Sequence, residues 1–285
     1  MKQRIHRSKR LTFLVIALCL CFMVVIACYA FTRTCYCGDF AYKRRLDGTI
    51  IITKYTGRDE TLEIPNEIDG RSVTALGDYA FEGCKNLQSV SIGATVDIMG
   101  VNPFLACSNL ESIELSPEQT HFAIMDGALV NTDTMKLISY PCGLKQETYV
   151  IPQRIRSIGQ ESFWYCAYLS EVTVPDGVMD IEPAAFIGCT RLETANIGRN
   201  VISIEDNAFA FCTAVRSINI PESVTTIGKE AFFCCSCLQT LSIPDSVRFI
   251  GKEAFRGCRI TLKGNKGSYV ERYACEKGIP FLCDN

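Results

Sequence analysis

Cysteine and histidine are the residues of this sequence best suited to chemistry. The chain of 285 residues contains 17 cysteines and two histidines, His6 and His121. A cysteine nucleophile needs a base beside a thiol in an electropositive setting. Because His121 is the one histidine beyond the basic N-terminal segment, the chain offers a single histidine that could act as the base of a Cys/His dyad. A Cys-dependent enzyme is therefore the weakest interpretation of the chain.

The densest group of thiols, Cys234-Cys235-Ser236-Cys237, raises the question of a metal site. A structural zinc site takes four ligands, usually as two closely spaced pairs. No second pair occurs at that spacing, and Cys35-Tyr36-Cys37 is an isolated C-x-C. The sequence also contains no phosphate-binding glycine motif. We therefore expect no catalytic residue, no cofactor and no metal.

Most of the cysteines recur at a fixed interval together with phenylalanine. In IPESVTTIGKEAFFCC and IPDSVRFIGKEAFRGC the same pattern returns after 23 residues, which is typical of a solenoid. Because one slot recurs in every coil, we interpret its cysteines as small buried side chains. Stacked coils would place neighbouring thiols about 5 Å apart, which leaves disulfide pairing open. The predicted structural ladder consists of Phe81, Phe104, Phe163, Phe186, Phe209, Phe232, Phe255, Cys84, Cys107, Cys166, Cys189, Cys212, Cys235 and Cys258.

The remainder of each repeat predicts how a coil is built. After the cysteine comes L-x-x-V-x-I, the strand pattern of a leucine-rich repeat, followed in several copies by a proline that ends the strand. Alternation turns the aliphatic residues inward and the residues between them outward. The I-G-x-x-A-F-x-x-C half has near-helical spacing. We therefore predict an α/β repeat solenoid, with a parallel β-sheet on the concave face and short helical turns on the convex side.

The segments IPESVTTIGKEAFFCC, IPDSVRFIGKEAFRGC and VPDGVMDIEPAAFIGC resemble the BspA-type leucine-rich repeats of bacterial surface proteins. The resemblance extends from about residue 38 to the C-terminus. It implies a non-catalytic surface module of a class in which several members are implicated in adhesion to host proteins or other cells. It implies no particular ligand, because members of the family differ in what they bind.

The outward residues of the strands form the best candidate binding face. Concave faces of solenoids commonly bind extended partners, and small hydroxyl and amide groups suit a glycan or a peptide backbone. The same residues lack the large aromatic and arginine anchors of tight protein interfaces, so an ordinary solvated sheet face is an equal alternative. The residues of this polar strip are Ser89, Ser91, Ser112, Glu114, Glu171, Thr173, Thr194, Asn196, Ser217, Asn219, Thr240 and Ser242.

The N-terminal 31 residues indicate attachment to a membrane. Residues 1–10 contain five Lys or Arg and no acid, and residues 11–31 form an uncharged run long enough to span a bilayer. The preceding positive charge predicts a cytoplasmic N-terminus and an exported body. Two interpretations stay open: an uncleaved signal anchor, or a lipoprotein signal in which Val25-Ile26-Ala27-Cys28 is a lipobox and Cys28 is lipidated. A cleaved secretory peptide is less favoured because its small-residue cleavage site is poor.

The charge of the body excludes one class of partner. Beyond residue 10, 24 of the 29 basic residues stand against 31 acidic ones, a net charge of −7. Nucleic-acid binders carry a basic stripe that neutralises phosphates, so we expect no nucleic-acid partner. The predicted partners are a membrane and an unidentified protein or glycan.

The sequence divides into segments that we expect to differ in role. Asp47-Gly48 between strand-like runs predicts a hairpin, and Ser268 with Glu271 predicts the start of a helix in the C-terminal cap. We predict a membrane-attached, extracytoplasmic recognition or adhesion protein, with a structural spacer as the alternative. The predicted segments are a basic segment 1–10, an anchor or lipoprotein signal 11–31, a linker 32–45, a cap hairpin 46–63, a solenoid 64–262 with an irregular insertion at about 116–147, and a cap 263–285.

Overall fold

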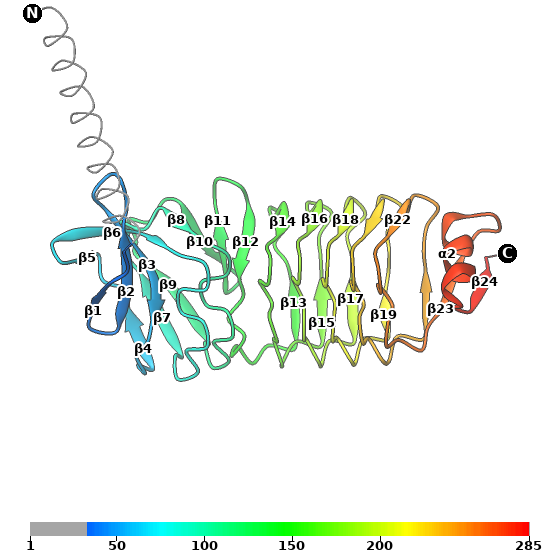
Figure 1. Cartoon of the computed structure of the whole chain (residues 1–285), viewed down its shortest axis with the longest axis horizontal. Helices are drawn as coiled ribbons and strands as arrows, with labels where there is room; N and C mark the ends of the chain where they lie inside the picture. Colours follow the sequence, from blue (N-terminus) through cyan, green and yellow to red (C-terminus); the bar gives the residue numbers. More distant parts are fainter. Residues whose placement is uncertain (1–32, 285) are drawn as a thin grey trace, which may run out of the picture.

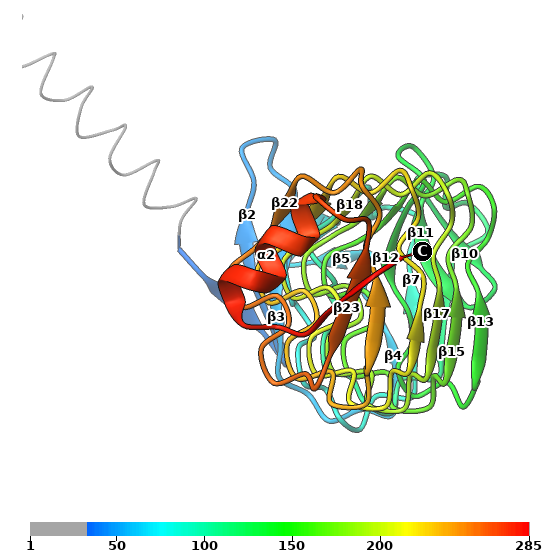
Figure 2. The same cartoon turned by 90° about the vertical axis from the view of Figure 1, so that its right-hand side faces the viewer.

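The coils of the chain stack along one axis and form an elongated solenoid of about ten turns (Figure 1). The structure, a computed structural model, describes residues 33–284. The first strands of the described chain lie at one end of the long axis, and helix α2 (Tyr269–Lys277) lies at the other (Figure 1). Figure 2 views the solenoid close to this axis and shows the successive coils superposed, so equivalent parts of each repeat lie over one another.

The L-x-x-V-x-I spacing forms a first ladder of short strands that run parallel from coil to coil. Val172 pairs with Ala195, and Ala195 pairs with Ile218, because the repeat length returns the same position to the same place in the next coil. The aliphatic residues are buried and the residues between them are partly or fully exposed, as predicted. This ladder comprises β4 (Thr61–Glu63), β7 (Ser89–Ile92) and β9 (Ser112–Leu115), then β13 (Thr148–Val150), β15 (Glu171–Thr173), β17 (Thr194–Asn196) and β19 (Ser217–Ile218), then β21 (Thr240–Ser242), β23 (Thr261–Gly264) and β24 (Phe281–Cys283).

The Ile-Gly half of the repeat forms a second parallel ladder, and this corrects the predicted α/β architecture. Each strand ends on the isoleucine that precedes glycine or its equivalent, and Ile204 pairs with both Ile181 and Ile227. Of residues 33–284, only α2 is helical. The convex helical turns predicted from I-G-x-x-A-F are therefore β-strands followed by tight turns. The strands are β14 (Ser157–Ile158), β16 (Asp180–Ile181), β18 (Ser203–Ile204), β20 (Thr226–Ile227) and β22 (Phe249–Ile250).

Left-handed residues explain why this half does not become helical. In the coil around Phe209, Asn207 has φ 58° and Phe211 has φ 60°. A right-handed helix does not accommodate positive φ, so two such residues in five interrupt the spacing that looked helical. The backbone instead bonds to the next coil, as when the Phe209 N–H donates to the carbonyl of Ala231 at 2.8 Å. Interactions between coils thus replace interactions within a helix.

The N-terminal end closes with antiparallel strands. Strands β2 and β3 pair around Asp47-Gly48, where Gly48 has φ 87°. Strand β3 then pairs in parallel with β6, which carries the ladder into the first coils. The strands of this end are β1 (Cys35–Cys37), β2 (Phe40–Arg44), β3 (Ile50–Tyr55), β5 (Glu67–Ile68), β6 (Arg71–Leu76) and β8 (Ile98–Met99).

The irregular segment forms a meander of three antiparallel strands, β10 (Phe122–Met125), β11 (Ala128–Asn131) and β12 (Lys136–Ser139). Strand β12 then pairs in parallel with β14, so the second ladder continues from the meander into the regular coils. At the C-terminal end, Ser268 caps α2 by accepting a hydrogen bond from the Glu271 N–H at 3.2 Å, and Gly278 ends the helix with φ 65°.

Phenylalanine and cysteine fill the centre of the coils. All seven predicted Phe residues are buried, and Phe186 stacks on Phe209 with ring centroids 5.1 Å apart. The core divides into two hydrophobic clusters, one mainly N-terminal to residue 139 and one running from residue 128 to the C-terminal cap. The clusters interleave in the meander, where Leu129 belongs to the first and Ala128 to the second.

The predicted membrane segment and the candidate lipidation residue lie outside the described residues. Residues 11–31 and Cys28 both precede residue 33. Between residues 33 and 284, no helix has the length and apolar character needed to cross a bilayer. The anchor and its two alternatives therefore stay predictions.

Candidate binding face

The polar strip predicted from the sequence lies on the first ladder, and its residues come from three separate sheets. Ser89, Ser91, Ser112 and Glu114 belong to β7 and β9. Glu171 to Ser217 belong to β15, β17 and β19, whereas Thr240 and Ser242 belong to β21. All twelve side chains are partly or fully exposed. The strip is therefore an accessible row that breaks twice, between β9 and β13 and between β19 and β21.

The strip is most regular in the middle sheet. Glu171, Thr194 and Ser217 stand opposite one another in successive coils, and Thr173 stands opposite Asn196. The Asn196 amide donates to the carboxylate of Glu171 at 3.1 Å. Exposed carboxylate, amide and hydroxyl groups in one register form a row of hydrogen-bonding groups at the spacing of neighbouring strands, about 4.8 Å.

Asn219 has a different role from the one predicted for it. Its side-chain oxygen accepts from the Ile197 N–H at 2.7 Å, and its amide donates to the Ile197 carbonyl at 2.8 Å. The side chain therefore completes the ladder where β19 stops at Ile218. Because both polar groups are engaged with the backbone, Asn219 offers less to a ligand than its exposure implies.

The structure extends the strip at both ends with residues that the repeat phase did not reveal. Thr61 stands opposite Ser89 at the N-terminal end, and Thr261 stands opposite Thr240 at the C-terminal end. Thr148 stands opposite Glu171. Thr148 begins the middle sheet, and the return of the repeat pattern at Ile151-Pro152 could have indicated its place in the strip. Thr61 and Thr261 flank coils that lack the full repeat, so the repeat pattern did not indicate them.

Five of the seven predicted ladder cysteines donate hydrogen bonds to carbonyls, and none of the seven belongs to the strip. Cys212 donates its S–H to the carbonyl of Phe186 at 3.1 Å, and Cys189, Cys235 and Cys258 donate in the same way to the phenylalanine 26 positions earlier. Burial raises the pKa of the Cys212 thiol well above its ordinary value, which keeps this donor protonated. The prediction of small buried hydrophobes missed this polar role.

Cys142 is an additional ladder member that the break in phase concealed. Its sulfur lies 2.7 Å from the sulfur of Cys166, and Tyr140 stacks on Phe163 with centroids 5.0 Å apart. The residues Tyr140-Pro141-Cys142-Gly143 thus continue the stack across the irregular segment. All fourteen cysteines of the described chain are free thiols.

The other side chains that we considered for catalysis or metal binding do not lie together in residues 33–284. His121 lies 3.3 Å from Asp133 on the meander, at an exposed position. Cys234 is half-buried and Cys237 is exposed, on either side of the buried Cys235. Among residues 33–284, no three His, Cys, Asp or Glu side chains lie in a group suited to a metal ion.

The chain is similar to a known repeat family in sequence and to solved bacterial proteins in fold. A family model described as the BspA-type leucine-rich repeat region matches residues 59–149 and 140–261, with six copies. A leucine-rich cell surface protein from Faecalibacterium prausnitzii is 20% identical, with a TM-score of 0.58 over 85% of this chain and 97% of that chain. The pneumococcal vaccine antigen PcpA is 13% identical, with a TM-score of 0.61 over 89% of this chain and 99% of that chain. At these identities the likeness shows the fold alone. A comparison with curated proteins gives no match.

Proposed function

The chain belongs to the BspA-type leucine-rich repeat family, and from that premise we propose that it is a non-catalytic recognition and adhesion protein of a bacterial surface. The membrane attachment is either the apolar segment 11–31 or a lipid on Cys28. The solenoid is the extracytoplasmic part, and its ligand is a protein or a glycan. The matched model describes a structural repeat and no catalytic family.

One observation carries the proposal: the polar strip repeats the same kind of exposed group in register over successive coils. Glu171, Thr194 and Ser217 form one such row. A core residue needs periodicity to pack, but an exposed residue gains little from it. An extended ligand with its own repeat, such as a glycan chain or a peptide backbone, would meet equivalent groups at each step.

The test is a pair of charge changes on the strip. In Thr194→Lys/Ser217→Lys, two cations stand opposite each other in neighbouring coils. We expect this variant to lose binding to a panel of immobilised extracellular-matrix proteins and glycans, while its circular dichroism spectrum stays that of the native chain. The measurement uses the full chain in a non-ionic detergent.

A matched control places the same charges elsewhere on the same two coils. Ile202 and Thr225 are both exposed and adjoin the second ladder. Ile202→Lys/Thr225→Lys should keep the binding that the strip variant loses. Equal binding by both variants would show that the strip is not the binding face. Absence of binding by the native chain to the whole panel would favour the alternative function, a structural spacer without a ligand of its own.

A further inference from the structure

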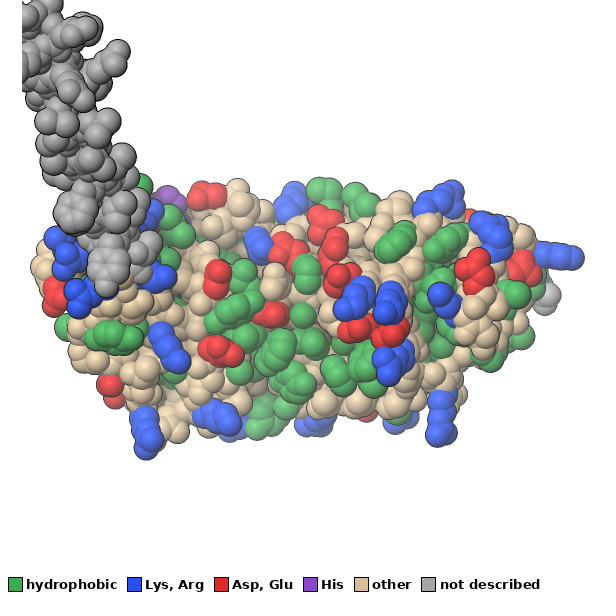
Figure 3. All heavy atoms as spheres, in the orientation of Figure 1, with side chains coloured by type: hydrophobic (Ala, Val, Ile, Leu, Met, Phe, Trp, Pro, Cys, Tyr) green, Lys and Arg blue, Asp and Glu red, His purple; other side chains and the backbone are tan. Residues whose placement is uncertain are grey.

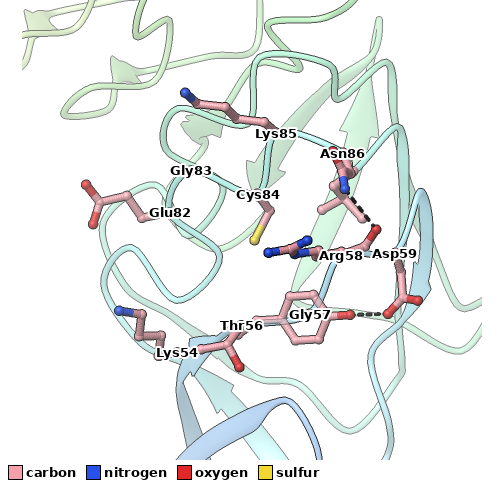
Figure 4. Close-up of a pocket in the computed structure, with 12 residues that line it drawn as sticks. Lys54, Thr56, Gly57, Arg58, Asp59, Glu82, Gly83, Cys84, Lys85 and Asn86 are labelled. Atoms are coloured by element: carbon pink, nitrogen blue, oxygen red, sulfur yellow. Dashed lines mark hydrogen bonds between the residues drawn. The ribbon is translucent and has the colours of Figure 1, made fainter.

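A cavity lies at the N-terminal end of the cysteine ladder. It has a volume of about 490 Å³, and Cys84 lines it together with Lys54, Arg58 and Lys85. Cys84 belongs to the first coil that has the ladder cysteine, and the preceding coil supplies residues 54–59 in place of another Phe and Cys. Figure 4 shows the Cys84 sulfur among the residues that line this cavity.

Cys84 differs from the buried ladder thiols in its hydrogen bonding. Cys107, in the next coil, donates its S–H to the carbonyl of Phe81 at 3.0 Å. Within residues 33–284, the thiol of Cys84 donates no hydrogen bond to a carbonyl. Contact with the side chain of Cys107, whose own S–H is donated to Phe81, lowers the pKa of Cys84, while partial burial opposes this effect. A half-exposed thiol with these contacts is suited to react as a thiolate.

The charges around the cavity favour an anion. Lys54, Arg58 and Lys85 are all exposed, and none of their nitrogens lies within 4.0 Å of a carboxylate oxygen of the described chain. Two acids also line the cavity, but the Asp59 carboxylate accepts a hydrogen bond from the Tyr55 hydroxyl. Figure 4 shows the Arg58 guanidinium and the Cys84 sulfur turned toward one another, with Glu82 extending away from the sulfur.

We propose that this cavity is a thiol-modification site, in which Cys84 forms a mixed disulfide with a small disulfide that carries carboxylates. The volume is within the range of sites for small molecules. The cationic side chains bind the carboxylates, and the sulfur of Cys84 meets the disulfide bond. Glutathione disulfide has this chemistry, as does any short peptide disulfide with free carboxylates.

The reaction is a thiol–disulfide exchange and needs no other oxidant. The Cys84 thiolate attacks one sulfur of the disulfide, a new sulfur–sulfur bond forms, and the original bond breaks. The second half of the disulfide leaves as a thiolate and takes up the proton that Cys84 released. One protein thiol is oxidised and one half of the small disulfide is reduced, so atoms and electrons balance.

The test compares disulfides that differ in charge. The full chain in a non-ionic detergent at low salt is treated with glutathione disulfide, with neutral 2-hydroxyethyl disulfide or with dicationic cystamine, and peptide mass spectrometry locates the modified cysteines over time. We expect Cys84 to react about tenfold faster with the anionic than with the cationic disulfide, because a cationic cavity concentrates anions. The neutral disulfide reports accessibility alone.

Cys258 is the matched control at the other end of the ladder. It is also half-exposed, but its S–H donates to the carbonyl of Phe232 at 2.9 Å. The adjacent Cys235 side chain lowers the pKa of Cys258 as Cys107 lowers that of Cys84, so the two thiols are compared in their preference for charge, and we expect none at Cys258. Arg58→Ala should bring the rates at Cys84 with the two charged disulfides within about threefold of each other, whereas Arg58→Lys should keep most of the preference. The proposal is overturned if native Cys84 stays unmodified, or if its charge preference is absent or survives Arg58→Ala.

Discussion

The regular coils and the N-terminal half of the solenoid use the same residues and pack them differently. From Phe186 to Phe255 the rings are almost parallel, with interplanar angles of 9°, 4° and 4° in successive pairs. At the N-terminal end the angles are larger, 39° between Tyr55 and Phe81 and 29° between Phe81 and Phe104. Phe81 and Phe104 are 23 residues apart, as are the rings of the regular coils, so the period alone does not set the angle between neighbouring rings.

The two halves also join in different ways. Within the regular coils, backbone hydrogen bonds connect every coil to the next, as from the Phe186 N–H to the Ala208 carbonyl at 2.8 Å. At the junction, the Asn102 amide donates to the carbonyl of Glu161 at 2.7 Å, and the Gln160 amide donates to the Tyr79 hydroxyl at 3.2 Å. A backbone bond crosses here as well, from the Gly143 N–H to the Leu110 carbonyl at 2.8 Å. Side chains therefore add to the backbone bonds at the junction, where the period is interrupted.

Removal of a ring should be the strongest test of this difference. Phe209 stacks on rings on both sides, at 5.1 and 5.7 Å, whereas among residues 33–284 Phe104 stacks on Phe81 alone, at 5.3 Å. We expect Phe209→Ala to cost about 3–5 kcal/mol of unfolding free energy, and Phe104→Ala to cost less. Hydrogen exchange measured by mass spectrometry would show the loss in the coils on both sides of Phe209. Equal costs at the two sites would contradict the importance of two-sided stacking.

Removal of a thiol should have the next largest effect. In Cys212→Ala the carbonyl of Phe186 loses its S–H donor but keeps the Cys189 N–H at 3.3 Å, and we expect a cost of about 1 kcal/mol for the lost hydrogen bond. Cys84→Ala should cost less, because this thiol is half-exposed and donates to no carbonyl of the described chain. Chemical denaturation of both variants gives the comparison. If both variants lose the same unfolding free energy, the S–H hydrogen bond of Cys212 does not contribute measurably to stability.

A side-chain bond at the junction should have a local effect. Asn102 is 3% exposed and donates across the junction to Glu161. We expect Asn102→Ala to cost about 1 kcal/mol and to speed hydrogen exchange on both sides, near residues 101–105 and 159–163. The control is Asn109→Ala, because exposed Asn109 makes an amide-to-carbonyl bond of equal length, 2.7 Å, to Lys85. Similar exchange in both variants would show that Asn102 does not link the two halves.

The N-terminal cap should show an effect that appears only at high pH. A hydrogen bond from the Tyr42 hydroxyl to Asp69 raises the pKa of Tyr42 to about 12, from its ordinary value of 10.0, and burial adds to the shift. The folded state therefore holds this proton more tightly. The corresponding stabilisation is complete below pH 10 and is lost as the pH rises through 12. Asp69→Asn should lower the pKa of Tyr42, which ultraviolet absorbance can follow, with Tyr42→Phe identifying the signal.

Residue spacing predicted much of the fold and part of the candidate site. The family resemblance is confirmed, as are the repeat, its period and the inward and outward faces of the first ladder. The Ile-Gly half was predicted as helical because Ile, Ala and Phe recur at a spacing that helices share. The left-handed residues that prevent a helix, such as Asn207, have no fixed residue type from coil to coil. Sequence spacing therefore carried no signal for the second ladder.

The sequence by itself determined which side chains are inside, because an exact period and alternating polarity leave each coil one way to bury its aliphatic residues and phenylalanine. Only the tertiary structure decided what the inside residues do at the ends and at the break. Cys84 and Cys212 occupy the same slot of the repeat, yet one opens into a cationic cavity and the other donates to a carbonyl. The difference arises from the neighbouring coil, which lies about one period away in sequence and in direct contact in space.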